Sequence, residues 1–130
     1  MMALYTNLLA CLLLGDDKRL HARVVQLMAG KQDFTAPVTA LLELVWVLEV
    51  NGLATDDNVR GLNLLLGLPN FKPQQVDAIR QALAGYAHGL DFADALHLAL
   101  SHGRQQLATF DKAFARQAAK LGLLPPVVAI

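Results

Sequence analysis

Short apolar runs alternate along the whole chain with segments in which apolar residues recur at helical spacing. The runs at residues 2–5, 34–38 and 106–109 have the length and composition of buried strands. Between them, apolar residues recur every three or four positions, as they do on the buried face of a helix. This alternation of strands and helices is typical of βα units around a parallel sheet.

The same pattern predicts seven helices and two further short strands. We expect helices over about residues 6–14, 16–29, 39–51, 55–68, 74–86, 91–101 and 111–120, a very short strand at 71–72 and an edge strand at 127–130. Thr6 or Asn7 would cap the first helix, Gly15 would end it, and Thr39 would cap the third. Because the third helix is hydrophobic nearly all round, we expect it to be buried between the sheet and another layer.

Composition narrows the class of protein. A chain of 130 residues is expected to form a single domain over residues 1–130. Hydrophobic residues make up 55% of it and no apolar run is long enough to span a bilayer, so the surplus points to a protein–protein interface. Eleven basic and eleven acidic residues leave no global basic field, so any nucleic-acid contact must be local. The single cysteine, Cys11, and the lack of a basic leader favour a cytoplasmic protein with Cys11 as a buried small hydrophobe.

Four carboxylates stand in otherwise apolar stretches: Glu43, Asp91, Asp94 and Asp111. An ionised carboxylate in apolar surroundings is costly unless it is paired or binds a metal. Asp91 and Asp94 share one helix face, and Asp111 follows a strand whose carboxyl end would open into a crevice. Hard cations such as Mg²⁺ prefer carboxylate oxygens, and a site of this kind supports hydrolysis of a phosphodiester.

Each of these residues also has a purely structural interpretation. Glu43 and Asp94 could be surface charges on helices, and Asp91 and Asp111 could cap the helices that they precede. His97 shares a face with Asp94, but a histidine in this setting is more often a packed core residue than a metal ligand.

Residues near the acids have two interpretations as well. Lys112 and Arg116 could contact phosphate or simply be solvated. Thr6, Asn7 and Thr109 could orient acids or water, or serve as caps and turn residues. Trp46 is expected in the core or an interface rather than as a platform for stacking bases.

Four motifs in order resemble one known family. Residues 3–7, 42–44, 94–99 and 109–111 together look like a PIN-domain protein of the VapC toxin type. The resemblance implies an α/β fold, a three-layer α/β/α sandwich with a central parallel sheet. It also implies a Mg²⁺- or Mn²⁺-dependent endoribonuclease, the toxin half of a toxin–antitoxin pair, acting on RNA such as tRNA. A VapB-like antitoxin and a second copy of the chain would be its partners, with no membrane involved.

Carried over residue by residue, the resemblance assigns metal binding to Glu43, Asp94 and Asp111, with Asp91 as an additional catalytic acid. The family's first acid falls on Tyr5. A phenol with a pKa near 10 is a poor Mg²⁺ ligand at neutral pH, and its ring would fill space meant for the ion and its water. The sequence therefore leaves two hypotheses, an impaired nuclease and a catalytically inactive module that binds antitoxin or RNA.

Overall fold

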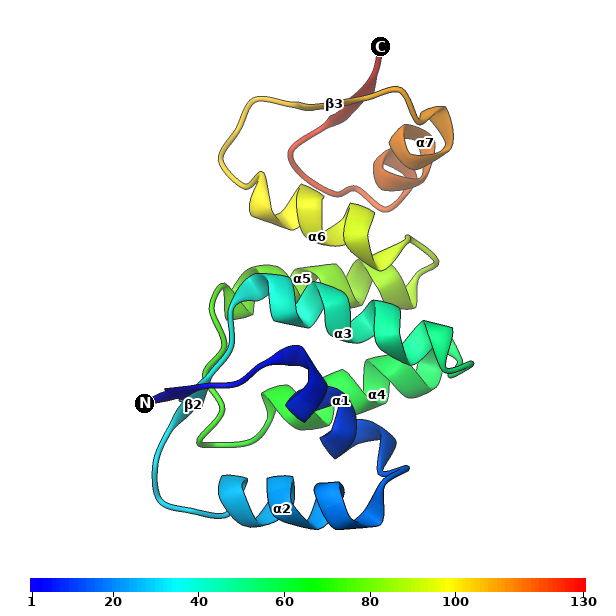
Figure 1. The fold of residues 1–130 in the computed structure, drawn as a ribbon. Helices are drawn as coiled ribbons and strands as arrows, with labels where there is room; N and C mark the ends of the chain where they lie inside the picture. The colour runs from blue at the N-terminus through cyan, green and yellow to red at the C-terminus, as the bar shows by residue number, and fades with distance from the viewer. The chain divides into compact units, whose positions relative to one another are not determined.

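The computed structural model describes all of residues 1–130 and contains two compact units, unit 1 (Met1–Val76) and unit 2 (Asp77–Ile130). Each unit holds helices and one parallel pair of strands (Figure 1). The predicted fold class, α/β with parallel strands, is therefore confirmed. None of the seven helices is long and apolar enough to span a bilayer. That the 130 residues fold as a single domain stays a prediction.

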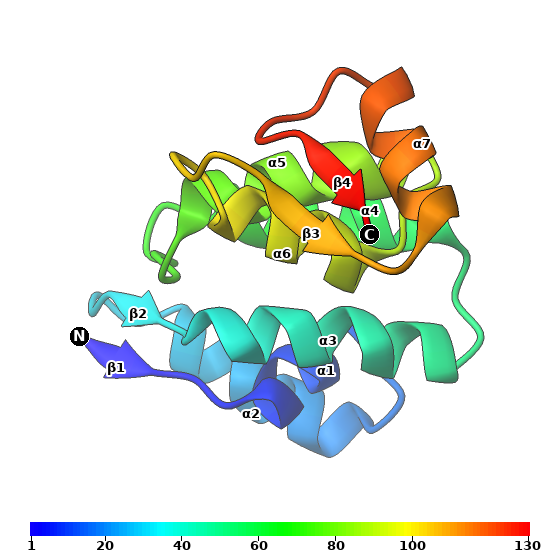
Figure 2. The ribbon, with the colours of Figure 1, turned by 90° about the horizontal axis from the view of Figure 1, so that it is seen from above.

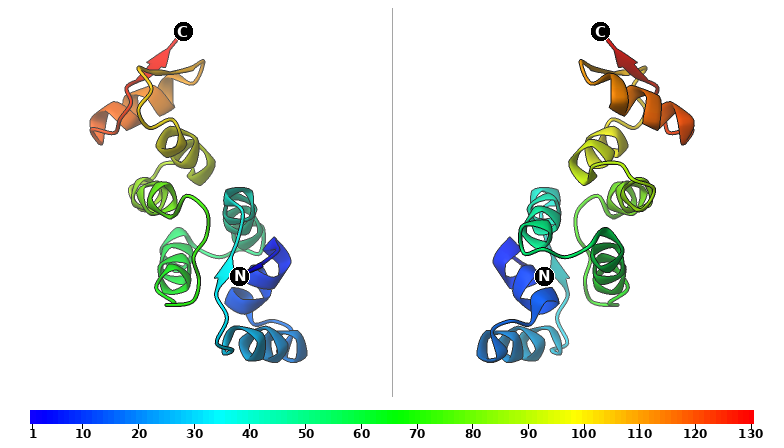
Figure 3. Two further views of the ribbon diagram at one scale, coloured as in Figure 1. Left: turned by 90° about the vertical axis from the view of Figure 1, so that its left-hand side faces the viewer. Right: turned by 90° about the vertical axis from the view of Figure 1, so that its right-hand side faces the viewer.

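Unit 1 joins a short parallel strand pair to four helices. β1 (Met2–Ala3) pairs with β2 (Phe34–Thr35), and a further parallel bridge joins Phe34 to Phe71 (Figure 2). The helices are α1 (Thr6–Leu14), α2 (Lys18–Met28), α3 (Val38–Val50) and α4 (Thr55–Leu66). Helix α1 packs against α2 and α3, and α3 also contacts α4, as Figure 3 shows. The packing places the start of α1 next to α3.

The ends of the first two helices follow from local chemistry. Gly15 ends α1 with φ +60° and donates its N–H to the Cys11 carbonyl, which confirms the predicted stop. Asp17 caps α2 by accepting hydrogen bonds from the N–H groups of Arg19 and Leu20. These caps fix where the chain turns between α1 and α2.

Unit 2 contains α5 (Val76–Ala87) from its second residue on, together with α6 (Phe92–Leu100), β3 (Leu107–Thr109), α7 (Lys112–Lys120) and β4 (Val127–Ala129). β3 and β4 pair in parallel, and α7 packs against β4. Tyr86 meets Phe92 edge to face, with ring centroids 5.6 Å apart. At Gly85 of α5, an added Cβ would lie 3.1 Å from Leu90 and 3.3 Å from Ala95. A side chain at this position would therefore need its neighbours to shift by a few tenths of an ångström.

The structure corrects three expectations. The residue that caps α1 is Tyr5 rather than Thr6 or Asn7, and Pro37 rather than Thr39 precedes α3; neither gives a side-chain cap. Helix α3 is not buried all round, because only one face packs and Trp46 is 64% exposed on another. An apolar composition alone does not determine which face of a helix packs against other helices. The strands contain two or three residues each, shorter than predicted.

Candidate functional site

Two acids of unit 2 stand at the starts of its helices. Asp91 caps α6, its Oδ2 accepting the Asp94 N–H at 3.1 Å. Asp111 caps α7, its Oδ1 accepting the Phe114 N–H at 3.0 Å, while its own N–H donates to Thr109 Oγ1 at 3.0 Å. The capping interpretation of both residues is confirmed. A cap still leaves the second carboxylate oxygen able to bind something else.

The acids of unit 2 also act on one another electrostatically. The pKa of Asp94 is raised above its ordinary value, first because burial disfavours the charged carboxylate and then because Asp91 and Asp111 are negative. His97 works in the opposite direction. His97 is exposed, so the expectation of a packed core histidine is wrong. Unit 2 thus brings three of the four predicted acids within electrostatic range.

In unit 1, Glu43 is held by Thr6. Thr6 is buried at the start of α1, and its hydroxyl donates to Glu43 Oε1 on α3 at 3.4 Å. This hydrogen bond agrees with the expectation that Thr6 orients an acid, a role that stays a prediction, whereas Asn7 is exposed and makes no such bond. Tyr5 is 69% exposed and borders, with Glu43, a hollow of about 480 Å³. The phenol therefore stands beside the acid that it was predicted to accompany.

Burial of the acids is less than the apolar sequence context suggested. Glu43, Asp91 and Asp111 are exposed, and only Asp94 is partly buried. Apolar neighbours in sequence lie on other faces of the helix, and a cap residue stands at its end. Glu43 is exposed, as its surface interpretation requires, while its role as a metal ligand stays a prediction; the expected desolvation cost applies to Asp94 alone.

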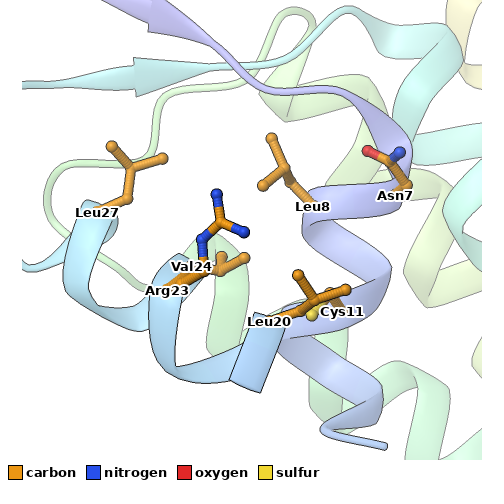
Figure 4. A pocket seen from close by; sticks show the side chains of 7 residues that line it. All are labelled: Asn7, Leu8, Cys11, Leu20, Arg23, Val24 and Leu27. Atoms are coloured by element: carbon orange, nitrogen blue, oxygen red, sulfur yellow. The ribbon is translucent and has the colours of Figure 1, made fainter. Parts of the chain in front are cut away.

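A second hollow of about 480 Å³ lies between α1 and α2. Figure 4 shows the Arg23 guanidinium turned over it, among apolar side chains. The lining residues are Asn7, Leu8, Cys11, Leu20, Arg23, Val24 and Leu27. Cys11 is partly exposed there rather than a buried core residue. Sequence reasoning missed Arg23, although its helical spacing from Leu20 and Leu27 could have signalled a charge on an apolar stripe.

The basic candidates of unit 2 lie on α7. Lys112 and Arg116 are exposed, one turn apart, directly after Asp111. Neither takes part in the ion pairs Arg60–Asp57 and Lys72–Asp33. Their predicted role as phosphate contacts stays a prediction, and solvated residues would look the same.

The carboxylates of the candidate site are suitable ligands for a hard cation. Carboxylate oxygens are what Mg²⁺ and Mn²⁺ prefer, and the mutual repulsion of Asp91, Asp94 and Asp111 is what a divalent ion relieves. Neither unit by itself brings three His, Cys, Asp or Glu side chains into a ready-made metal cluster. The predicted set Glu43, Asp94 and Asp111 draws on both units and stays a prediction.

Comparison with known proteins identifies the family. Curated protein sequences give no significant match. The PIN domain model matches residues 4–120, a range that includes every acid described above. PIN domains are generally nucleases and usually use divalent metal ions, in keeping with oxygen donors alone at Glu43, Asp94 and Asp111. The chain belongs to the PIN domain family and has a nuclease-type α/β fold.

Proposed function

We propose that this chain is a Mg²⁺- or Mn²⁺-dependent endoribonuclease of the VapC toxin type whose activity is impaired by Tyr5. The observation that carries the proposal is the grouping of Asp91, Asp94 and Asp111 at the starts of α6 and α7 in a PIN-domain chain. Carboxylates that repel one another at a family's acidic motifs are the expected resting state of a cation site.

Asp94, Asp111 and Glu43 would hold the ion, which when bound supplies positive charge that steadies a phosphodiester during hydrolysis. The chain's own residues prepare those carboxylates. The Thr6 hydroxyl orients Glu43, and Thr109 fixes the backbone of Asp111. Asp91 fixes the first turn of α6, and with it the position of Asp94.

The remaining functional groups concern RNA and protein partners. Lys112 and Arg116 would bind phosphates of an RNA such as tRNA, because both are exposed cations without a partner close to Asp111. A VapB-like antitoxin would bind apolar surface of unit 1, and the hollow beneath Arg23 supports this. A homodimer and a cytoplasmic location belong to the same proposal.

Tyr5 favours a second candidate function, that of a catalytically inactive PIN module that binds antitoxin or RNA. The neutral phenol lines the same hollow as Glu43, at the position where the resemblance places the family's first acid. Because Tyr5 is 69% exposed, its ring is accessible to a protein or RNA partner. An exposed aromatic residue at a former metal position is more useful for binding than for metal chemistry.

Cleavage of tRNA in Mn²⁺ by the unmodified chain and by Tyr5→Asp separates the two candidates. We expect Tyr5→Asp to cleave faster, on the order of 10²-fold, because it restores a carboxylate that helps to hold the cation, and the bound cation stabilises the transition state. Tyr5→Phe is the matched control and should not gain activity. Asp94→Asn in the Tyr5→Asp protein should remove the gain.

Equal cleavage by the unmodified chain and Tyr5→Asp would show that the impairment assigned to Tyr5 is wrong. Absence of cleavage by both would favour the inactive module. Titration of Mg²⁺ by calorimetry adds an independent measurement, since tight binding to the unmodified chain would contradict the inactive module.

A further inference from the structure

Phe110 occupies the corner between β3 and α7 and is 87% exposed, more than any other large hydrophobic side chain of the protein. A single exposed apolar residue is ordinary on a protein surface. Phe110 matters because of its position: the next residue is Asp111, whose charge acts on Asp94.

The backbone on both sides of Phe110 is fixed. The Thr109 carbonyl accepts the Ile130 N–H at 2.9 Å, and the Thr109 hydroxyl accepts the Asp111 N–H at 3.0 Å. Asp111 in turn accepts the Phe114 N–H at 3.0 Å. The ring therefore projects from a rigid corner, and a ligand that contacts it pays little to order the backbone.

The surroundings of Phe110 suit nucleic acid better than a protein partner. The core of a protein interface is depleted of charged residues, whereas Phe110 is followed directly by Asp111 and Lys112, with Arg116 one turn later. Proteins that bind single-stranded RNA combine cations for the phosphates with aromatic rings on which unpaired bases stack. The β3–α7 corner provides both.

We propose that Phe110 is a base-stacking residue that holds one unpaired nucleotide of an RNA substrate beside the acids of unit 2. This inference rests on the proposed nuclease function and narrows its substrate to single-stranded or loop RNA. A phenylalanine ring has no hydrogen-bonding group, so the contact selects an unstacked base without selecting which base it is.

The test measures the binding of a labelled RNA hairpin by fluorescence anisotropy. EDTA is present so that no cleavage occurs. The duplex stem without its loop is the reference RNA. We expect Phe110→Ala and Phe110→Leu to weaken hairpin binding between about 5- and 150-fold, the effect of losing one stacked base. Phe110→Trp should retain binding. Ile130→Ala, which removes a 75% exposed apolar side chain directly after the neighbouring strand β4, should change nothing.

Unchanged hairpin binding by Phe110→Ala would overturn the inference, as would absence of hairpin binding by the unmodified chain. Retained binding by Phe110→Leu, or an equal loss in Ile130→Ala, would also overturn it, because the contact would then be hydrophobic rather than stacking.

The nuclease proposal fails separately from this one. Hairpin binding that depends on Phe110, with no cleavage in Mn²⁺ even by Tyr5→Asp, would keep the stacking residue and refute the nuclease. In an active Tyr5→Asp protein, Phe110→Ala should raise KM for the hairpin more than it lowers kcat, because the ring positions the substrate and does not take part in the chemistry.

Discussion

The two units of this protein offer different surfaces. Unit 1 carries two hollows of about 480 Å³, one of them lined by leucines beneath Arg23, and its acid Glu43 is held by a buried hydroxyl. Unit 2 carries a hollow of only about 20 Å³, but it places Asp91 and Asp111 at the starts of two helices. Unit 1 therefore offers apolar hollows, whereas unit 2 offers interacting carboxylates.

The difference shows that unit 2 places three carboxylates within electrostatic range of one another without a deep pocket. Helix starts have free N–H groups that hold a carboxylate in place, and the helix dipole favours negative charge there. Asp91 and Asp111 therefore stabilise α6 and α7 while their charges raise the pKa of Asp94. Under the proposed function, Asp91 and Asp111 would serve both stability and catalysis, so substitutions must be chosen to separate the two roles.

The largest expected effects come from the cores of the two units. Leu44→Ala in unit 1 should cost about 2–5 kcal/mol of the free energy of unfolding, and Phe92→Ala in unit 2 about 3–5 kcal/mol, because both side chains are fully buried. Unfolding in urea can be followed by circular dichroism and by the fluorescence of Trp46, the only tryptophan, which lies in unit 1.

The fluorescence of Trp46 decides whether the units fold together. In a single domain, Phe92→Ala shifts the Trp46 transition as far as it shifts the circular dichroism. A Trp46 transition that Phe92→Ala leaves in place would contradict the single-domain prediction and show that unit 1 unfolds alone.

Local features of the fold could be predicted from sequence, and long-range ones could not. Gly15 acts through neighbours a few residues away, so its residue type was sufficient to place the end of α1; for the start of α2 the sequence left Asp16 and Asp17 open, and the structure shows Asp17 as the cap. The exposure of Trp46 depends on which face of α3 finds partners elsewhere in the chain. No apolar pattern within the helix itself contains that information.

The same division holds for the candidate site. Glu43, Asp94 and Asp111 were found because each stands in a short motif, but the Thr6–Glu43 hydrogen bond joins residues 37 positions apart. Sequence suggested that Thr6 supports an acid and could not say which one. Arg23 was missed because a charge among leucines on an exposed helix is usually only solvated.

A smaller effect is expected at the caps, where each unit offers a matched residue. Asp111→Ala should cost about 0.5–2 kcal/mol because the Phe114 N–H loses its acceptor, and Asp17→Ala should cost a similar amount in α2. Asp111→Ser and Asp17→Ser should restore most of that stability, since serine also caps helices. Thermal unfolding measures the stability of each variant.

Cleavage separates the two caps. In an active Tyr5→Asp protein, Asp111→Ser should abolish cleavage because the carboxylate is gone, whereas Asp17→Ser should leave cleavage unchanged. Full activity of Asp111→Ser would reduce Asp111 to a cap and remove it from the proposed metal set.

The smallest effect concerns Asp94 and the dependence of stability on pH. Its pKa in the folded protein lies above the ordinary value of 3.8, so the ionised carboxylate weakens the fold at any pH above the raised pKa. Below 3.8 the group is protonated in both states and the penalty disappears. Asp94→Asn should therefore melt slightly above the unmodified chain at neutral pH and at the same temperature as that chain in acid.

Asp77→Asn, in the exposed first turn of α5, controls for loss of a charge at a helix start and should not melt higher. Equal melting of Asp94→Asn and the unmodified chain at neutral pH would mean that burial and the charges of Asp91 and Asp111 place no strain on Asp94, and the distinction between a charged unit 2 and a contact-forming unit 1 would lose its electrostatic basis.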